Sequence, residues 1–435
     1  SVTMSLSLSK QEVAFQAKVR KFAQAHIEPL AAKVEREGYY PREVLTKMGR
    51  ERLLGAPFPK SDGGLGLGWS YEILVAEEVS AVSAATEMVR LASAALYSAP
   101  LSFFGSKSQK KDYLVPVLSG EKVGALALTE PGAGSDAASI VTLAKRNGQD
   151  FLLNGEKRFI TNGGVADFLF VFAVTNPKKP ARSGVSAFIV PRESKGVTIV
   201  KDYELLGMRG ARVTHLRFRN ARVPGGNVVG GLNQGFQILL DELDKERPAV
   251  AAGMIGIARS ALEAAVRHSM VRKQFGRAIR EFEGVSFKIA DMATKLEASR
   301  LLVLKSARMI DAGKRARKEG AMAKLFATES AFEIAHQALQ VHGGIGYTKE
   351  LPVERYFRDA RFMMIGGGTS EIMRYVIQRE VYREAGASRT HCYSKASHEV
   401  TRAFSRVGEK TKLKQGSIIC QRSRSRIIAG SARTF

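Results

Sequence analysis

Hydrophobic and polar positions follow a helical period over residues 1–122, where apolar side chains recur every three to four positions. Ser9 and Glu12 stand at the spacing of a capping box, so the first helix is expected to begin directly after Ser9. Proline lacks the backbone N–H that a helix interior needs, so helix breaks are expected at Pro100 and Pro116. This part of the chain is therefore predicted to be a helical N-terminal domain.

The pattern changes at residue 123, where short runs rich in β-branched and aromatic residues replace the helical period. Runs such as VGALALT, FLFVFAVT and GVSAFIV follow one another closely up to about residue 233. The pair Asn154-Gly155 has the residue types favoured in a two-residue hairpin turn, so a turn is expected there. Residues 123–233 are predicted to form a sheet or a barrel-like β domain.

Helical spacing returns in residues 234–386, with apolar residues every three to four positions over residues 289–303. Long helices with short connections predict a helical bundle. Proline is favoured at the first position of a helix, so one of these helices is expected to begin at Pro248. That start would leave Glu246 and Arg247 in the turn before the helix.

Length and composition bound the class of protein. At 435 residues with 45% hydrophobic content, the chain is long enough for two or three domains. No run of eighteen apolar residues and no basic-then-apolar leader is visible, so we expect a soluble protein without stable membrane insertion. The two cysteines, Cys392 and Cys420, argue against a disulfide framework and favour a reducing compartment.

The formal net charge of +25 is enriched toward the C-terminus, because residues 387–435 carry eleven Lys or Arg against two Glu. Polar and basic residues without an apolar period dominate this segment, which predicts a disordered basic tail. Such a charge is compatible with binding to nucleic acid or to a membrane surface, and this alternative from another class of protein stays open.

Several common catalytic motifs are missing from the sequence. It has no HExxH, no GxSxG and no Walker GxxxxGK[ST] pattern, so ordinary hydrolysis is not favoured and no metal site is predicted. Glycine-rich turns stand instead at residues 130–136, 342–346 and 366–371. Backbone N–H groups in such turns can hold a phosphate or the polar edge of a ring, because glycine permits close approach. Their spacing differs from the Rossmann fingerprint.

Six segments resemble the acyl-CoA dehydrogenase family in order and separation: ALTEPGAGSD, GEKRFITNGG, LDKERPAVAAG, RKQFGRAI, QVHGGIGYTKELPVERYFRDA and GGGTSEIMR. The resemblance covers about 380 residues, over 8–384. It implies a mainly α fold with a helical N-terminal domain, a central β-barrel-like domain and a C-terminal four-helix bundle. It also implies FAD between the last two domains and oxidation of an acyl-CoA to its trans-2-enoyl-CoA, with proton loss at the α carbon and hydride transfer from the β carbon to flavin N5.

The general base is the feature in which members of the family differ. Many members carry it as a glutamate directly before GTS, which is Gly367 here, and a glycine cannot accept a proton. In the isovaleryl-CoA and long-chain members the glutamate comes from the helix with the DxxR motif, which corresponds to Glu246. The resemblance therefore implies that Glu246 is the catalytic base, and that Glu371 faces the adenosine end of FAD. The implied substrate contacts are Ser135, Asp244, Arg247 and Arg379.

The resemblance also assigns contacts to the cofactor. Thr129 and Thr161 match positions that hydrogen-bond the flavin ring, and Phe159 replaces a tryptophan that is often stacked there. Glu283 departs from the family, which usually shows glutamine at this contact. The implied cofactor residues are Leu126, Thr129, Ser135, Phe159, Thr161, Arg272, Gln274, Phe275, Phe282, Gln340, Gly343, Gly344, Thr369 and Glu371.

The segment from Arg272 to Phe275 matches one that reaches the FAD of a neighbouring subunit, so a homotetramer built as a dimer of dimers is implied. Electrons are expected to pass to an electron-transfer flavoprotein; an oxygen-using acyl-CoA oxidase is the enzyme alternative. The expected location is the cytoplasm of a prokaryote or the mitochondrial matrix of a eukaryote. The sequence does not indicate which acyl chain the enzyme prefers, although Tyr97, Phe103 and Phe104 are candidates to shorten the acyl-chain pocket.

Overall fold

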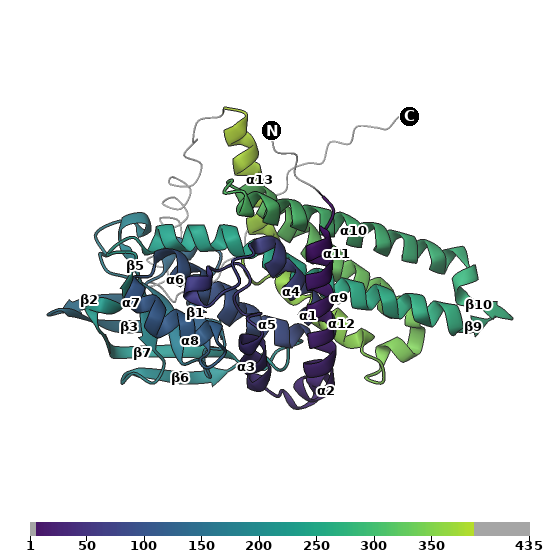
Figure 1. Ribbon diagram of the computed structural model, residues 1–435, viewed down its shortest axis with the longest axis horizontal. Helices are drawn as coiled ribbons and strands as arrows, with labels where there is room; N and C mark the ends of the chain where they lie inside the picture. The colour runs from purple at the N-terminus through teal and green to yellow at the C-terminus, as the bar shows by residue number, and fades with distance from the viewer. Residues whose placement is uncertain (1–5, 387–435) are drawn as a thin grey trace, which may run out of the picture. The chain divides into compact units, whose positions relative to one another are not determined.

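The computed structural model describes residues 6–386, so the predicted basic tail and its two cysteines lie outside the described residues. Helices come first, strands occupy the middle and helices return, which confirms the predicted mainly α fold with a central β domain (Figure 1). One cluster of buried apolar side chains runs through all three parts. They therefore pack as a single unit up to Val381.

The predicted capping box is present at the start of the first helix. The Ser9 hydroxyl accepts the N–H of Glu12, and the Glu12 carboxylate accepts the N–H of Ser9 at 2.8 Å. Glu12 also binds Arg308, which ties this helix start to the C-terminal part. The helices of the N-terminal part are α1 (Lys10–His26), α2 (Glu28–Glu37), α3 (Arg42–Arg50), α4 (Trp69–Val82), α5 (Ala84–Leu91), α6 (Ser98–Phe104), α7 (Lys107–Gln109) and α8 (Val115–Leu118).

The expected helix breaks at Pro100 and Pro116 are wrong. The chain stays helical through both prolines, and the segments before them, Ala92–Tyr97 and Lys110–Leu114, are π-helical. A π-helical turn pairs each N–H one residue further back, which accommodates both the missing N–H and the bulk of the proline ring. Both prolines therefore do mark an irregularity of the backbone. The helix widens into a π-helical segment before each proline and then continues.

The middle part is one twisted sheet with strand order β6-β7-β3-β2-β4-β5-β8, and β1 pairs in parallel with β4. Two neighbouring strands of this sheet, β4 and β5, are buried along almost their whole length, because nearly every residue in them is apolar. The strands are β1 (Gly124–Ala127), β2 (Leu143–Asn147), β3 (Asp150–Thr161), β4 (Phe168–Val174), β5 (Val185–Pro191), β6 (Val197–Asp202), β7 (Val213–Val223) and β8 (Val228–Val229).

The predicted hairpin turn at Asn154-Gly155 is wrong. Both residues lie inside β3, where the pairing with β7 shifts register, so the pair forms a bulge. The turn between β2 and β3 comes earlier, at Gly148, which has a left-handed φ of 63° and follows Asn147. This second Asn-Gly pair has the same turn chemistry, and the strand partners decide which of the two pairs turns.

The C-terminal part is built on three long helices that pack on one another, with α4 lying against two of them. Between the first two helices, a two-stranded hairpin of β9 (Lys273–Gln274) and β10 (Arg277–Ala278) projects at the end of the bundle (Figure 1). The helices are α9 (Gly235–Val271), α10 (Glu283–Asp311), α11 (Arg317–His342), α12 (Val353–Ala360) and α13 (Ser370–Glu384).

The expected helix start at Pro248 is wrong, because α9 runs through this proline for 37 residues. Pro248 deprives the Asp244 carbonyl of its helical N–H partner, yet the helix continues because α4 and α11 pack along it. Within the described residues, α9 is long and apolar enough to cross a membrane, but 67% of its most apolar window is buried in the protein. Glu246 and Arg247 consequently lie in a helix interior and are buried.

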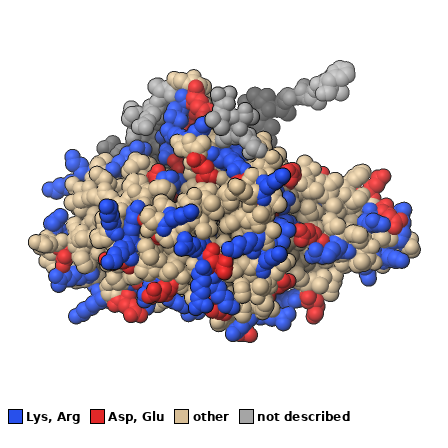
Figure 2. Space-filling model, in the orientation of Figure 1, with Lys and Arg blue, Asp and Glu red and all other residues tan. Residues whose placement is uncertain are grey.

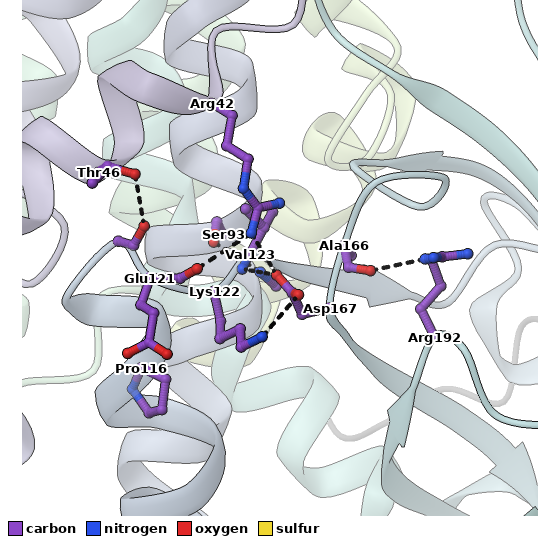
Figure 3. A network of polar contacts seen from close by, with 12 residues as sticks. Arg42, Thr46, Ser93, Pro116, Glu121, Lys122, Val123, Ala166, Asp167 and Arg192 are labelled. Atoms are coloured by element: carbon purple, nitrogen blue, oxygen red, sulfur yellow. Dashed lines mark hydrogen bonds and ion pairs between the residues drawn. The ribbon is translucent and has the colours of Figure 1, made fainter.

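Asp167 joins the helical N-terminal part to the sheet. Its carboxylate accepts the N–H of Val123 at 2.8 Å and a guanidinium N–H of Arg42 at 3.0 Å, and Lys122 Nζ lies 3.4 Å away (Figure 3). Burial alone would raise its pKa, but these donors hold the pKa of Asp167 below its usual value. The resulting stabilisation is present at neutral pH and is lost as pH falls through this lowered pKa.

Candidate active site

The buried face of α9 carries two carboxyl groups one helical turn apart. Glu242 is 2% exposed and Glu246 is 4% exposed. Residues four apart lie on the same helix face, so the two side chains are neighbours. Glutamate is seldom buried without a compensating partner, so this pair requires a physical explanation.

A glycine-rich loop lies over Glu246. A Cβ placed on Gly367 would be 3.5 Å from Glu246 Oε1, and Gly367 itself is exposed and has a left-handed φ of 63°. The ammonium group of Lys324, on α11, donates to the carbonyl of Gly368 and so fixes this loop. The two positions at which the family was expected to carry its base therefore meet at one place, and only Glu246 brings a carboxyl group there.

The charges around Glu246 act in opposite directions. Burial raises the pKa of Glu246, while the neighbouring Glu242 carboxyl and the positive charges of Arg247 and Lys324 act to lower it. Burial and Arg247 together lower the pKa of Lys324 to about 8, against the effect of Glu246. A carboxyl group with a raised pKa under an accessible glycine has the properties required of a general base near neutral pH.

The predicted substrate contacts next to Glu246 form ion pairs in this structure. Asp244 accepts from Arg247 at 3.0 Å and from Arg317 of α11 at 2.7 Å. The Arg247 Nε is buried and has no hydrogen-bond partner among the described residues, so this guanidinium retains a donor for another group. Arg379 is exposed on α13 and lies over the ring of Tyr375.

The predicted flavin-ring contacts gather at the end of β3 and in the loop after β1. Phe159 has a left-handed φ of 58° and is 53% exposed, so a bulge in β3 turns its ring outward. A buried ion pair of 2.8 Å between Lys157 and Glu130 fastens the glycine-rich turn at residues 130–136 to the same strand. The other members of this group are Leu126 in β1, Thr129 and Ser135 in the loop after it, and Thr161 at the end of β3.

A second group of predicted cofactor residues lies around the β9–β10 hairpin, at the far end of the bundle (Figure 1). Phe275 is 94% exposed at the tip of this hairpin. The rings of His268 on α9 and His342 on α11 stack 4.4 Å apart, which places the glycine turn after α11 beside the hairpin. This group contains Arg272, Gln274, Phe275, Phe282, Gln340, Gly343 and Gly344, whereas Thr369 and Glu371 stand at the start of α13.

The pocket candidates on the N-terminal helices lie in different surroundings. Tyr97 is fully buried, with its ring against Gly124 and its hydroxyl donating to the carbonyl of Tyr113 at 3.1 Å. Phe103 is exposed beneath the ammonium group of Lys245, 3.6 Å from the ring centre. Tyr97 therefore packs against the sheet, whereas Phe103 stands at the surface.

Two residues of the site were not predicted from the sequence, namely Glu242 and Lys324. Glu242 stands in DELDKER, which by composition resembles a solvated charge cluster, and Lys324 lies on another helix, 78 positions after Glu246. The available indication was the spacing of four between Glu242 and Glu246 behind two buried apolar residues, Ile238 and Leu239.

Comparisons with known families agree with this arrangement. Profiles of the acyl-CoA dehydrogenase N-terminal, middle and C-terminal domains match residues 9–121, 125–221 and 233–382. The chain belongs to the acyl-CoA dehydrogenase family. A probable acyl-CoA dehydrogenase of Bacillus subtilis is 41% identical over 380 residues, which are 87% of this chain and 100% of the relative.

This acyl-CoA dehydrogenase is also similar to two solved structures. Butyryl-CoA dehydrogenase from Megasphaera elsdenii matches with a TM-score of 0.84 and 35% identity, covering 87% of this chain and 100% of that one. A chain of the structure described as the electron transferring flavoprotein of Acidaminococcus fermentans matches with a TM-score of 0.85 and 38% identity, over 87% and 100%.

FAD is the cofactor of this enzyme, and the described residues fit it. Gly132 and Gly134 in the turn after β1, and Gly343 and Gly344 after α11, have no atom within 4 Å of the place where a Cβ would stand. Open glycine backbone of this kind lets the polar groups of a dinucleotide approach the N–H groups closely. When bound, the flavin supplies the hydride acceptor of the reaction.

Proposed function

We propose that the enzyme removes the α and β hydrogens of an acyl-CoA thioester to give the trans-2-enoyl-CoA, with Glu246 as the general base. The observation that carries this proposal is the buried Glu246 carboxyl beneath the exposed Gly367, 3.5 Å from the place where a side chain at position 367 would begin. A proton accepted there neutralises a charge that burial disfavours, so the site favours the transfer. Asp244 and Arg247 are proposed to hold the thioester beside the carboxylate.

The proposed electron acceptor is an electron-transfer flavoprotein. The match to a chain of the structure described as such a flavoprotein supports this choice. The oxygen-using acyl-CoA oxidase is the competing enzyme, and it would form hydrogen peroxide in air.

A single assay series tests the proposed function. The FAD-loaded enzyme is titrated anaerobically with straight and branched acyl-CoAs, and loss of the oxidised flavin absorbance reports the reaction. The reduced enzyme is then mixed with either an electron-transfer flavoprotein or air-saturated buffer. We expect rapid reoxidation by the flavoprotein and little peroxide in air; absence of flavin reduction with every acyl-CoA would contradict the proposal. The series also identifies the preferred acyl chain.

We further propose a homotetramer in which the hairpin end of one subunit completes the cofactor site of another. One group of cofactor residues lies at the ends of β1 and β3, whereas the other surrounds the β9–β10 hairpin at the far end of the bundle (Figure 1). Val271 and Phe275, at the hairpin end, are 75% and 94% exposed. Large apolar side chains exposed together are typical of an interaction surface.

Arg272→Ala should weaken both flavin retention and assembly. Arginine binds pyrophosphate through a fixed set of donors, and loss of one hydrogen bond to a charged group costs about a tenfold in affinity or more. Size-exclusion chromatography with light scattering measures assembly, and FAD released by acid measures cofactor content. Arg280→Ala is the matched control, because Arg280 is also exposed beside the hairpin. A fully flavinated Arg272→Ala monomer would contradict the shared site.

The alternative of a nucleic-acid or membrane-surface binder depends on the basic tail, which lies outside the described residues. On the face shown in Figure 2, Lys and Arg are scattered with Asp and Glu between them and form no single basic patch. We therefore propose no nucleic-acid partner for this face of the described residues. We propose the cytoplasm as the location in a prokaryote and the mitochondrial matrix in a eukaryote, in accord with the sparse use of cysteine.

A further inference from the structure

Glu242 is a buried carboxyl group for which the proposed reaction has no use. Neither of its carboxyl oxygens has a hydrogen-bond partner among the described residues. Glu246, four residues further along α9, lies on the same buried face of this helix, so its carboxyl group is the neighbour of Glu242. Two carboxyl oxygens can be bridged by a hydrogen only if one of the two carboxyl groups keeps its proton.

The charges nearby decide which of the two groups carries the negative charge. Lys324 of α11 and Arg247 of α9 both act on Glu246 and favour its ionised form. Glu242 is under the influence of Arg247, but Asp241 adds a second negative charge on its side. The asymmetry places the carboxylate on Glu246 and the proton on Glu242. Burial raises the pKa of both carboxyl groups, and that of Glu242 well above its usual range, so the pair favours keeping one proton.

We propose that Glu242 is a positioning residue for the base: as a neutral carboxylic acid it donates a hydrogen bond to the Glu246 carboxylate and keeps it ionised in the buried site. This inference rests on the proposed role of Glu246. Without such a donor, burial would drive Glu246 toward its protonated form, in which it cannot accept the α proton of the substrate. Glu242 keeps its own proton throughout, and the substrate proton ends on Glu246.

The arrangement also explains why a site with two carboxyl groups works with one base. Two buried carboxylates at this spacing repel each other, and sharing one proton removes the repulsion. Because Lys324 also holds the carbonyl of Gly368, the cation that stabilises the Glu246 carboxylate is fixed to the loop above it. The ionised base and the loop that covers it are thereby coupled.

The acidic limb of the rate profile tests the proposal. Flavin reduction by butanoyl-CoA and by 3-methylbutanoyl-CoA is measured anaerobically from acidic to alkaline pH in the FAD-loaded wild type, Glu242→Gln and Glu242→Leu. Leucine removes the hydrogen-bond donor, so the acidic limb should move to higher pH by about one unit. The rate of flavin reduction should therefore fall about tenfold at pH values below the limb and return to the wild-type rate at high pH. Glutamine retains an N–H donor and should keep the limb near its original place. Glu263→Gln, an exposed change on the same helix, is the matched control and should shift the limb by less than about a third of a unit.

The opposite results are equally distinct. If Glu242 carried the negative charge, both Gln and Leu would remove a repelling neighbour and move the limb to lower pH, which would overturn the proposal. A loss of rate by the same factor at every pH in Glu242→Leu would indicate a packing role only, and would also overturn it. Wild-type rates of flavin reduction in Glu246→Gln would instead show that Glu246 is not the base. A failure of the proposed function can therefore be told apart from a failure of the role proposed for Glu242.

Infrared difference spectroscopy gives a second measurement that does not depend on turnover or on the folding of the leucine variant. The carbonyl stretch of a buried protonated carboxyl group should be present at neutral pH in the wild type and in Glu246→Gln, and lost in Glu242→Gln. A band that is lost in Glu246→Gln and retained in Glu242→Gln would place the proton on Glu246 and overturn the proposal.

Discussion

Glu246→Gln should keep FAD and acyl-CoA bound but slow anaerobic flavin reduction by about 10² to 10⁴, the usual contribution of a positioned general base. Glutamine has the size and hydrogen-bonding capacity of glutamate, so it preserves the packing of this buried position on α9. It cannot accept the α proton of the thioester. Stopped-flow absorbance of the flavin measures the rate, and a spectral titration with an enoyl-CoA measures binding.

The pH dependence gives this prediction a sign. Burial raises the pKa of Glu246, and only the ionised carboxylate accepts a proton, so the wild-type rate should fall as pH drops through that raised pKa. The limb should be absent in Glu246→Gln, which has no group to titrate there. Glu263→Gln, an exposed change on the same helix, is the control and should behave as the wild type. Wild-type rates in Glu246→Gln would move the role of base to Glu371.

Periodicity alone was sufficient for the order of the three parts, because burial imposes a helical or an alternating period on whichever element packs against the core. The local errors share one cause. Pro248 lies in the interior of α9, and Pro100 lies in a continuous helix. Each helix continues past its proline because neighbouring elements pack along it and keep it helical. Asn154-Gly155 bulges inside β3 because its partner strand β7 runs past it. Single-residue preferences are weak against such packing.

The candidate site was likewise predictable only in part, because its surroundings come from distant parts of the chain. Glu246 could be assigned only through a resemblance, because a glutamate among Asp241, Lys245 and Arg247 has no local property that distinguishes it from a solvated charge. Its surroundings are non-local: Lys324 comes from α11 and Gly367 from the loop before α13. The division of the cofactor residues into two distant groups also depends on the fold, because α9 and α10 place the hairpin far from the sheet (Figure 1).

Moving the base to the loop should restore part of the rate. Glu246→Thr removes the carboxylate and should cost about 10² or more. Adding Gly367→Glu places a new side chain whose Cβ starts 3.5 Å from the position of the original Oε1. A carboxylate brought in from that side can reach the same α carbon, so the double variant should reduce its flavin at least tenfold faster than Glu246→Thr alone. The preferred acyl-chain length should change, because the new side chain occupies part of the pocket.

Backbone conformation limits how complete this recovery can be. Gly367 has a left-handed φ of 63°, which costs a residue with a Cβ about 1–2 kcal/mol unless the loop relaxes. Lys324, bound to the carbonyl of Gly368, resists such relaxation from below. Glu246→Thr with Gly367→Gln carries the same strain without a proton acceptor and is therefore the matched control. Equal recovery in the glutamine and glutamate double variants would show that the gain comes from loop rearrangement, and the loop would then not be a second site for the base in this chain.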